Sequence, residues 1–208
     1  MDKIRLISLP ILLLLLTSIS ATYQRTYTPG VAAGDNFTYE MYGVYTSDIP
    51  NITLAIPEFE KNNTDWTQIQ ITEITGSLIR QTYTLHFKNA SEFQFDFETD
   101  VNPQNQEIFK ISQQGVPICA ANLDSTDKIP TANIVLNDTV ERTYPDGERI
   151  LSHACWSQID ERGNIYFDRQ TGMLVELERT HKFTNPITGT ITEKTDIIKL
   201  IDTNRWQV

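Results

Sequence analysis

Three histidines are the residues of this chain best suited to acid–base or metal chemistry. His86, His153 and His181 lie far apart in the sequence, and none belongs to a His-Glu-x-x-His motif or another metal-binding spacing. Ser152 precedes His153 directly, but adjacent residues of a strand point to opposite faces of a sheet, so the two cannot form a nucleophile–base pair. The pattern predicts surface or satisfied histidines and no catalytic residue.

Oxygen ligands that could bind calcium gather in one acidic stretch. Asp160, Glu161, Asn164 and Asp168 fall in the sequence Asp-Glu-Arg-Gly-Asn-Ile-Tyr-Phe-Asp, with Asp146 nearby. The spacing does not match the EF-hand loop, and Asp and Gly at hairpin turns more often serve the backbone. A carboxylate pair for glycoside hydrolysis would need a defined separation, which the sequence does not provide. We therefore assign no catalytic, metal or cofactor residue.

The two cysteines, Cys119 and Cys155, predict a disulfide if the protein is exported, because an even pair in an oxidising compartment usually bonds. The bridge would close a loop of about 36 residues and stabilise the fold by roughly 3–4 kcal/mol in the chain-entropy model. Two free buried thiols or a metal pair are the alternatives. The absence of a Cys-x-x-Cys spacing disfavours the metal.

Asn-x-Ser/Thr sequons without a central proline make the chain a candidate glycoprotein. They are Asn36, Asn51, Asn62, Asn89 and Asn137. All of them fall on predicted turns or strand edges, where a glycan would be tolerated.

The first 21 residues are typical of a secretory signal peptide. Two basic residues begin the segment, an apolar run from Leu6 to Ser20 follows, and small residues end it. The run of about 15 residues is shorter than the roughly 20 that span a bilayer. We expect cleavage near Ser20 or Ala21, with an uncleaved membrane anchor as the alternative.

The rest of the chain is acidic and is expected to form one domain. The whole chain has a formal net charge of −10, and removal of Asp2, Lys3 and Arg5 with the leader leaves −11. This charge argues against nucleic acid or an anionic membrane surface as partner, since both attract clustered Lys and Arg. We divide the chain into a signal peptide at 1–21, a polar lead-in at 22–33 and a single β domain at 34–208.

The clearest structural signal is the stretch Tyr83–Glu98. Its apolar residues alternate with polar ones in two runs around a short polar turn, which predicts an antiparallel hairpin with one aromatic face. Other strands must cover that face, because a lone hairpin is at best marginally stable in water. The aromatic set consists of Tyr83, Phe87, Phe93, Phe95, Phe97 and Trp156. These residues either fill a core or, in a half-open barrel, line an apolar cavity.

Similar alternation predicts strands along the whole domain. The expected strands are 37–44, 66–74, 78–88, 92–99, 132–143, 148–159, 165–168, 173–183 and 190–201, and the stretch 132–143 is either straight or bent at Asn137-Asp138. We expect a tight turn at Asp160–Asn164, and an irregular crossing or a short helix within Val101–Asp127. The fold class is therefore all-β and antiparallel, with about nine or ten strands. It would be a sandwich, a barrel, or a strongly curved open sheet or half-barrel, preceded by an N-terminal signal helix.

Four segments, taken together, form a pattern that extends over most of the mature chain. They are Gly30-Val31 with Gly34-Asp35-Asn36-Phe37-Thr38-Tyr39; Ala121-Asn122-Leu123 followed by Ile129-Pro130; Val140-Glu141-Arg142-Thr143-Tyr144; and Tyr166-Phe167-Asp168-Arg169-Gln170-Thr171-Gly172-Met173-Leu174-Val175-Glu176. In order and spacing they resemble an uncharacterised family of archaeal secreted or membrane-anchored all-β proteins. The resemblance implies a location outside the cytoplasm and an all-β fold. That family has no established activity, so the resemblance implies no site residues.

These observations lead us to expect an exported, non-catalytic β domain that acts by binding at or outside the cell envelope. Its partner would be an apolar ligand or a molecule of the cell surface, and it would touch the membrane only through an uncleaved N-terminal segment. One alternative is a carrier of a lipid or other apolar ligand in a curved-sheet cavity. A second alternative is a glycan-active enzyme.

Overall fold

The computed structural model describes residues 25–48, 63–102, 117–129 and 134–208. The strands in this part are β1 (Asn36–Ser47), β2 (Thr64–Thr75), β3 (Leu78–Phe87), β4 (Glu92–Asp100), β5 (Lys128–Ile129), β6 (Ile134–Val135), β7 (Asp138–Tyr144), β8 (Gly147–Ser157), β9 (Glu161–Asp168), β10 (Leu174–Thr184) and β11 (Ile191–Thr203). No helix occurs among the described residues, so none of them forms a membrane-spanning helix. The all-β prediction is confirmed, and the predicted signal peptide and signal helix lie outside the described residues.

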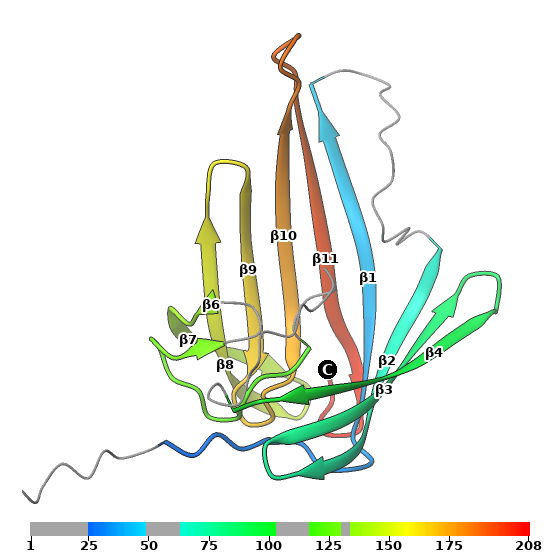
Figure 1. Cartoon of the computed structure of the whole chain (residues 1–208), viewed down its shortest axis with the longest axis vertical. Coiled ribbons are helices and arrows are strands. Elements are labelled where there is room, and N and C mark those ends of the chain that lie inside the picture. Colours follow the sequence, from blue (N-terminus) through cyan, green and yellow to red (C-terminus); the bar gives the residue numbers. More distant parts are fainter. Residues whose placement is uncertain (1–24, 49–62, 103–116, 130–133) are drawn as a thin grey trace, which may run out of the picture.

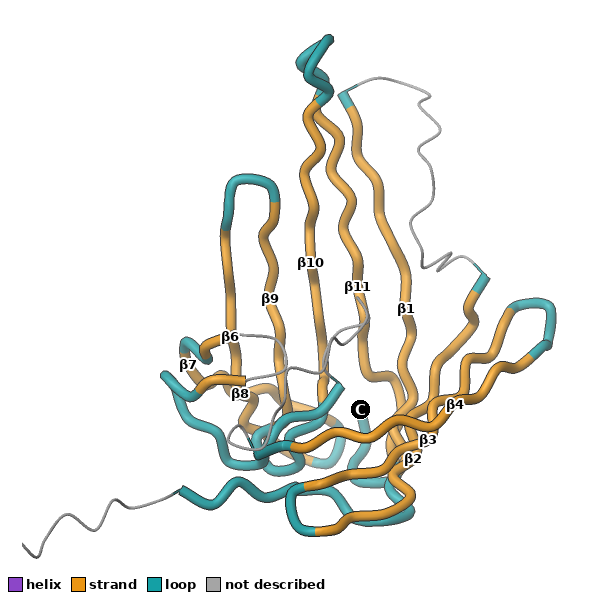
Figure 2. The backbone as a smooth tube through the Cα atoms, viewed as in Figure 1, coloured by secondary structure: helices purple, strands orange, loops and turns teal. Residues whose placement is uncertain are grey.

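Nine strands form one antiparallel sheet in the order β4-β3-β2-β1-β11-β10-β9-β8-β7. The sheet is strongly curved, and β2, β3 and β4 turn across the wall that β1, β11 and β10 form (Figures 1 and 2). Its edge strands β4 and β7 are not paired with each other, so the barrel stays open. In the described part of the chain, the predicted curved open sheet is therefore correct, and neither a closed barrel nor a sandwich of two separate sheets forms.

The core lies on the face of the sheet that we call the inner face. Phe37 of β1 and Phe167 of β9 are fully buried there, and Ile71 of β2 joins them. The segment 117–129 packs on the lower part of this face: Leu123 is buried and its carbonyl oxygen accepts a hydrogen bond of 3.0 Å from the Ser152 hydroxyl. The described part of the expected crossing, 101–102 and 117–127, thus consists of loop and turns with an isolated bridge from Ile118 to Met173, and it contains no helix.

One of two sequence predictions about this half of the chain is confirmed in part and the other is wrong. The extended stretch predicted at 132–143, with a bend at Asn137-Asp138, is divided at that bend: β6 pairs with β5, and β7 belongs to the large sheet. Asn137 makes the corner, because its backbone N–H donates to the carbonyl of His153 and its side chain accepts from the N–H of Cys155. The tight turn expected at Asp160–Asn164 is wrong, because β9 already begins at Glu161.

Candidate functional site

The candidate functional site is a pair of polar cross-strand rows on the inner face. Residues paired across antiparallel strands carry their side chains on the same face, so the register of the strands builds each row. The upper polar row crosses β1, β11, β10 and β9 and consists of Tyr45, Lys194, His181 and Glu161. The lower polar row crosses these strands and β8 and consists of Gly43, Asp196, Arg179, Gly163 and Trp156.

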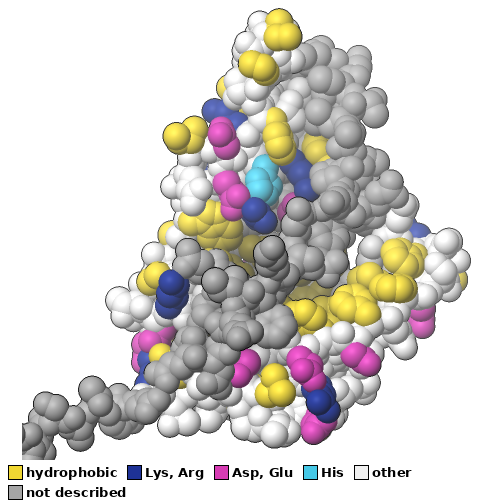
Figure 3. Space-filling view, viewed as in Figure 1, with side chains coloured by type: hydrophobic (Ala, Val, Ile, Leu, Met, Phe, Trp, Pro, Cys, Tyr) yellow, Lys and Arg dark blue, Asp and Glu magenta, His cyan; other side chains and the backbone are white. Residues whose placement is uncertain are grey.

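An apolar row lies directly below the two polar rows. It consists of Met41, Ile198, Leu177, Ile165 and Ala154. Four of its five side chains are buried, so the polar rows lie at the boundary between the core and the upper end of the sheet. Figure 3 shows a histidine with acidic and basic groups gathered on this upper part, and apolar groups along the β3–β4 side.

Trp156 lies over the glycine of its own row. A Cβ atom added to Gly163 would meet Trp156 Cζ2 at 2.4 Å and Cη2 at 2.6 Å, which is closer than real Cβ contacts. Only glycine therefore leaves room for the indole on the sheet. The indole N–H donates to Glu161 Oε1 at 2.8 Å, and this bond fixes the orientation of the ring. The contact with the indole therefore explains the glycine at position 163, which lies within β9 and does not form a turn.

Glu161 connects the two polar rows through Arg179. The guanidinium donates from Nε to Oε1 at 3.0 Å and from Nη2 to Oε2 at 2.9 Å, a two-bond geometry that is among the strongest ion pairs. Burial alone would raise the pKa of Glu161, but the hydrogen bonds from Arg179 and Trp156 outweigh it and lower this pKa. Burial and the charge of Arg179 lower the pKa of His181, whose Nδ1 is 3.6 Å from Glu161 Oε2.

A second ion pair lies on β11. Lys194 is 9% exposed, and its Nζ is 2.7 Å from Asp196 Oδ2. Tyr45 faces Lys194 across the β1–β11 pairing. Burial, and then the charge of Asp196, raise the pKa of this tyrosine. Its hydroxyl is buried and has no hydrogen-bond partner in the part of the chain that the structure describes. A buried hydroxyl without a partner is unfavourable, so this atom is suited to a group that would bind beside it.

The rows are suited to binding rather than to acid–base catalysis. A general acid needs a carboxyl whose pKa is raised toward neutrality, whereas the pKa of Glu161 is lowered and Asp196 is paired with a lysine. His181 faces Lys194 and Glu161, and neither is a hydroxyl or thiol nucleophile. The described residues contain no group of three His, Cys, Asp or Glu that could hold a metal ion.

The predicted aromatic set is divided between opposite walls of the sheet. Four of its members form what we call the aromatic strip on the inner face of β3 and β4: Tyr83, Phe93, Phe95 and Phe97. The ring centroids of Tyr83 and Phe95 are 5.0 Å apart, and those of Phe93 and Phe95 are 5.8 Å apart. Phe87 ends β3, and Trp156 belongs to the polar rows on β8.

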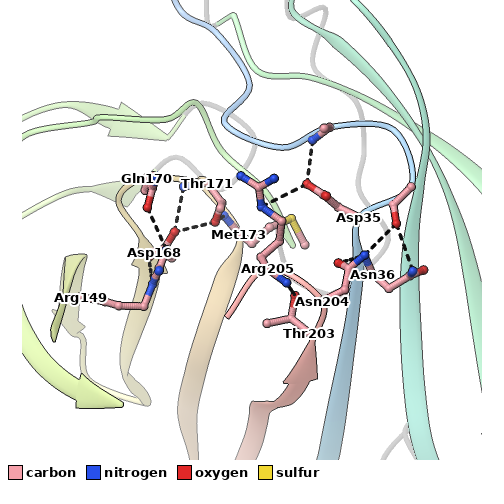
Figure 4. Close-up of polar contacts among 12 residues, drawn as sticks. Asp35, Asn36, Arg149, Asp168, Gln170, Thr171, Met173, Thr203, Asn204 and Arg205 are labelled. Atoms are coloured by element: carbon pink, nitrogen blue, oxygen red, sulfur yellow. Dashed lines mark hydrogen bonds and ion pairs between the residues drawn. The ribbon is translucent and has the colours of Figure 1, made fainter. Parts of the chain in front are cut away.

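A pocket of about 440 Å³ lies on another part of the molecule. Its lining consists of Asn122, Glu148, Arg149, Ile150, Asp168, Arg169 and Gln170. Asp168, which is 1% exposed, accepts from Arg149 at 2.8 Å and from the backbone and hydroxyl of Thr171 (Figure 4). Arg149 also lies 4.0 Å above the ring of Trp206, and Arg169 pairs with Asp124. The charges of this pocket thus hold the β9–β10 turn and the C-terminal segment in place.

A similar clamp holds the start of β1. Asp35 Oδ2 accepts from the N–H of Ala32 at 2.7 Å and is 3.6 Å from Arg205 Nε (Figure 4). Asn204 donates from its side chain to the carbonyl of Gly34 and accepts from the N–H of Asn36. Both clusters of Figure 4 therefore have a structural role.

The predicted disulfide is wrong for this structure, in which Cys119 and Cys155 are free thiols. Cys119 is buried, and its Sγ is 3.4 Å from the carbonyl oxygen of Gly172, next to the β9–β10 turn. Burial strongly raises the pKa of this thiol. Cys155 is exposed on β8, because it alternates with the inward-facing Ala154 and Trp156. An even count of cysteines does not reveal such opposed environments.

The described sequons lie at the surface or close to it. Asn89 is exposed in the β3–β4 turn and Asn137 is exposed at the corner before β7. Asn36 is half-buried at the start of β1, where its side-chain amide donates to Gly34. Asn51 and Asn62 lie outside the described residues. Glycosylation stays a prediction.

Most of the polar rows escaped the sequence analysis, which singled out only Trp156, Glu161 and His181. A signal was present in the strands that supply them. On β11, Lys194 and Asp196 occupy the same alternate positions as the buried Ile198. On β10, Arg179 and His181 occupy the same alternate positions as the buried Leu177. Polar residues on the core-facing positions of a strand indicate a site or a buried ion pair.

A comparison of the chain with protein family models, curated proteins and solved structures finds no match in any of the three.

Proposed function

We propose that the protein is a non-catalytic binding protein of the cell exterior, which holds an amphiphilic ligand against the inner face of its curved sheet. The observation that carries this proposal is the aromatic strip of β3 and β4. It lies on the inner face, yet Phe93 is 56% exposed, and Phe95 and Phe97 are only partly buried. An aromatic surface of this kind gains free energy when an apolar group covers it.

The two faces of the β3–β4 hairpin differ sharply in chemistry. On the outer face, Thr82 donates to Asp96 at 2.7 Å and Arg80 pairs with Glu98 at 2.5 Å. The outer face is therefore satisfied by its own polar contacts, whereas the inner face carries the aromatic strip. This amphipathic hairpin forms one edge of the sheet.

The same inner face also carries the two polar rows. The strand order places the aromatic strip at the β4 side and the polar rows on β1 and on β11 through β8. A ligand with both an apolar and a polar part matches this surface better than the purely apolar cargo that the sequence analysis offered as an alternative. Ligand sites commonly combine an apolar lining with a few polar groups that orient the ligand.

A glycan-active enzyme is less well supported. Glycoside hydrolysis uses one carboxyl that stays protonated near neutral pH, beside a second that is ionised. In the polar rows, the carboxylate of Glu161 accepts hydrogen bonds from Arg179 and Trp156, which lower its pKa, and Asp196 is paired with Lys194. No observation favours this candidate over binding.

A location outside the cytoplasm rests on the predicted leader and on the sequons. Asn89 lies in the exposed β3–β4 turn and Asn137 at the exposed corner before β7, and exposed positions of this kind can carry a glycan. The resemblance to archaeal exported proteins is consistent with this location. The free thiols place no demand on the compartment.

Native mass spectrometry of the mature protein, purified from its own host, tests the proposal. We expect a mass increment that disappears on denaturation and that corresponds to an amphiphile. The same measurement reports cleavage of the leader and the presence of glycans. A bare mass, combined with no binding of octyl-chain amphiphiles in calorimetry, would refute the proposal.

Two single variants locate the ligand on the inner face. Phe95→Ser removes the central ring of the aromatic strip, and we expect it to weaken binding of an octyl-chain probe at least tenfold. Tyr42→Ser is the matched control, because Tyr42 is 40% exposed but lies on the outer face of β1. Equal affinities of the two variants would show that the strip does not bind the apolar part.

A further inference from the structure

We infer that the two polar rows form a subsite for a neutral, polyhydroxylated head group, such as a sugar ring, which stacks on Trp156. This inference deepens the proposed function and rests on it, since it names the polar part of the amphiphile. Three independent observations lead to it: the position of the indole, the balance of charge in the rows, and a buried hydroxyl without a partner.

The indole of Trp156 is held as a platform. Its six-membered ring lies over Gly163, as the 2.4 Å and 2.6 Å contacts of an added Cβ show, and Glu161 binds its N–H. One face of the ring therefore packs on the strand, and the side chain remains partly exposed. The C–H face of a sugar ring is apolar, and its burial against an aromatic face is favourable.

The charges of the rows balance one another. Arg179 and Lys194 supply two positive charges, and each has a carboxylate within 3.0 Å. Burial and the nearby guanidinium lower the pKa of His181, which disfavours a third positive charge in the rows. A charged head group would compete with an existing ion pair. Beside each row residue that attracts it, it would also meet a residue of its own sign that repels it. The rows therefore disfavour anions and cations alike and accept a neutral group.

The rows also present donors and acceptors side by side. A guanidinium has five N–H donors and a carboxylate accepts about four hydrogen bonds, so ion pairing leaves capacity on both. Each hydroxyl of a sugar both donates and accepts, which fits such a mixed surface better than a group that only accepts. Tyr45 provides the most direct indication, because its hydroxyl is buried in the upper row and has no partner among the described residues. A ligand hydroxyl would satisfy it.

Head groups on a common octyl tail test the inference. The probes are octyl β-glucoside, octylphosphocholine, octyl sulfate and octyltrimethylammonium, each titrated by calorimetry below its critical micelle concentration. We expect the glucoside to bind at least tenfold more tightly than the other three. Equal affinity for all four would overturn the sugar subsite and leave the apolar half of the proposed function standing. No binding of any probe, with a bare native mass, would refute the proposed function as well.

Variants of the rows provide a second readout. Trp156→Ala should weaken glucoside binding at least tenfold, and Trp156→Phe should weaken it less, because a ring face remains. Trp66→Ala is the control, since Trp66 stacks on His86 on the outer face and should leave the affinity unchanged. A Trp156→Ala affinity equal to that of the parent protein would overturn the inference.

Tyr45→Phe separates binding from folding. It removes only the hydroxyl, so we expect unchanged or increased thermal stability together with a several-fold loss of glucoside affinity. Unchanged affinity for the glucoside would show that the buried hydroxyl is not a contact of the head group. Methyl β-glucoside, which has no tail, should bind weakly and with the same dependence on Tyr45.

Discussion

Gly163→Ala is the sharpest test of the arrangement on which the binding surface depends. The new Cβ atom would lie 2.4 Å from Trp156 Cζ2 and 2.7 Å from the backbone oxygen of Glu178. The oxygen belongs to the neighbouring strand and cannot easily move. The indole must therefore lift from the sheet, and its hydrogen bond to Glu161 is stretched or lost.

The expected cost can be estimated from these contacts. Overpacking of a well-packed site costs about 1–3 kcal/mol. Loss of a partly exposed hydrogen bond adds roughly 0.5–1 kcal/mol. Replacement of a glycine within a strand by alanine stabilises the folded state by about 0.5–1 kcal/mol, because alanine loses less conformational entropy on folding. We therefore expect Gly163→Ala to lower the free energy of unfolding by about 2 kcal/mol.

A double-mutant cycle separates the indole from the backbone. In a Trp156→Ala background the contact with the ring no longer exists, and only the contact with the oxygen of Glu178 remains. The same Gly163→Ala substitution should then cost about 1 kcal/mol, so that the two sites are coupled by about 1 kcal/mol. Urea unfolding followed by far-ultraviolet circular dichroism measures all four proteins. An equal cost in both backgrounds would refute the stacked position of Trp156 and, with it, the platform for the head group.

Three further predictions follow from buried or paired groups. Asp168→Asn should lower the free energy of unfolding by about 3 kcal/mol, because it removes the buried charge partner of the partly buried Arg149 guanidinium. Asp138→Asn, at a pair whose carboxylate is exposed, should cost less than about 1 kcal/mol in the same urea assay. Similar costs of the two substitutions would contradict this. A thiol reagent should modify Cys155 in the native protein and Cys119 only after unfolding. A protein mass lower than the sequence mass by two hydrogens would indicate a disulfide and contradict the free thiols. The pKa of His181 is lower in the folded protein than in the unfolded chain, so the unfolded chain binds a proton first and the free energy of unfolding should fall as the pH drops below the usual 6.5. His181→Asn should reduce this fall between pH 7.5 and 5.5. An unchanged dependence of the free energy of unfolding on pH would exclude the histidine as its source.

The elements with short-range signals were predictable from the sequence. The hairpin of β3 and β4 forms with one aromatic face, as the alternation of aromatic and polar residues predicts, and it pairs Tyr83 with Phe95. Alternation also indicated most strands of the second half. Such signals depend on neighbours in the chain, because a period of two assigns side chains to faces wherever the strand finally lies.

Errors arose where distant residues override a local signal. Asp-Glu-Arg-Gly-Asn looked like a turn, since these residues favour turns, but β9 runs through it because Gly163 is needed beneath Trp156. The cysteine pair looked like a disulfide, but Cys119 faces the β9–β10 turn from within the core while Cys155 faces solvent. Neither environment can be known before the strands are placed.

By itself, the sequence determined the all-β class, the acidic surface, the positions of most strands and the aromatic face of one hairpin. Only the tertiary structure decided that a single curved sheet would form and that β1 would pair with β11. That pairing brings Tyr45 beside Lys194, although the two are far apart in the chain. The physical reason is that alternation assigns a side chain to a face, whereas strand order and register assign its neighbours across the sheet, and the polar rows consist of such neighbours.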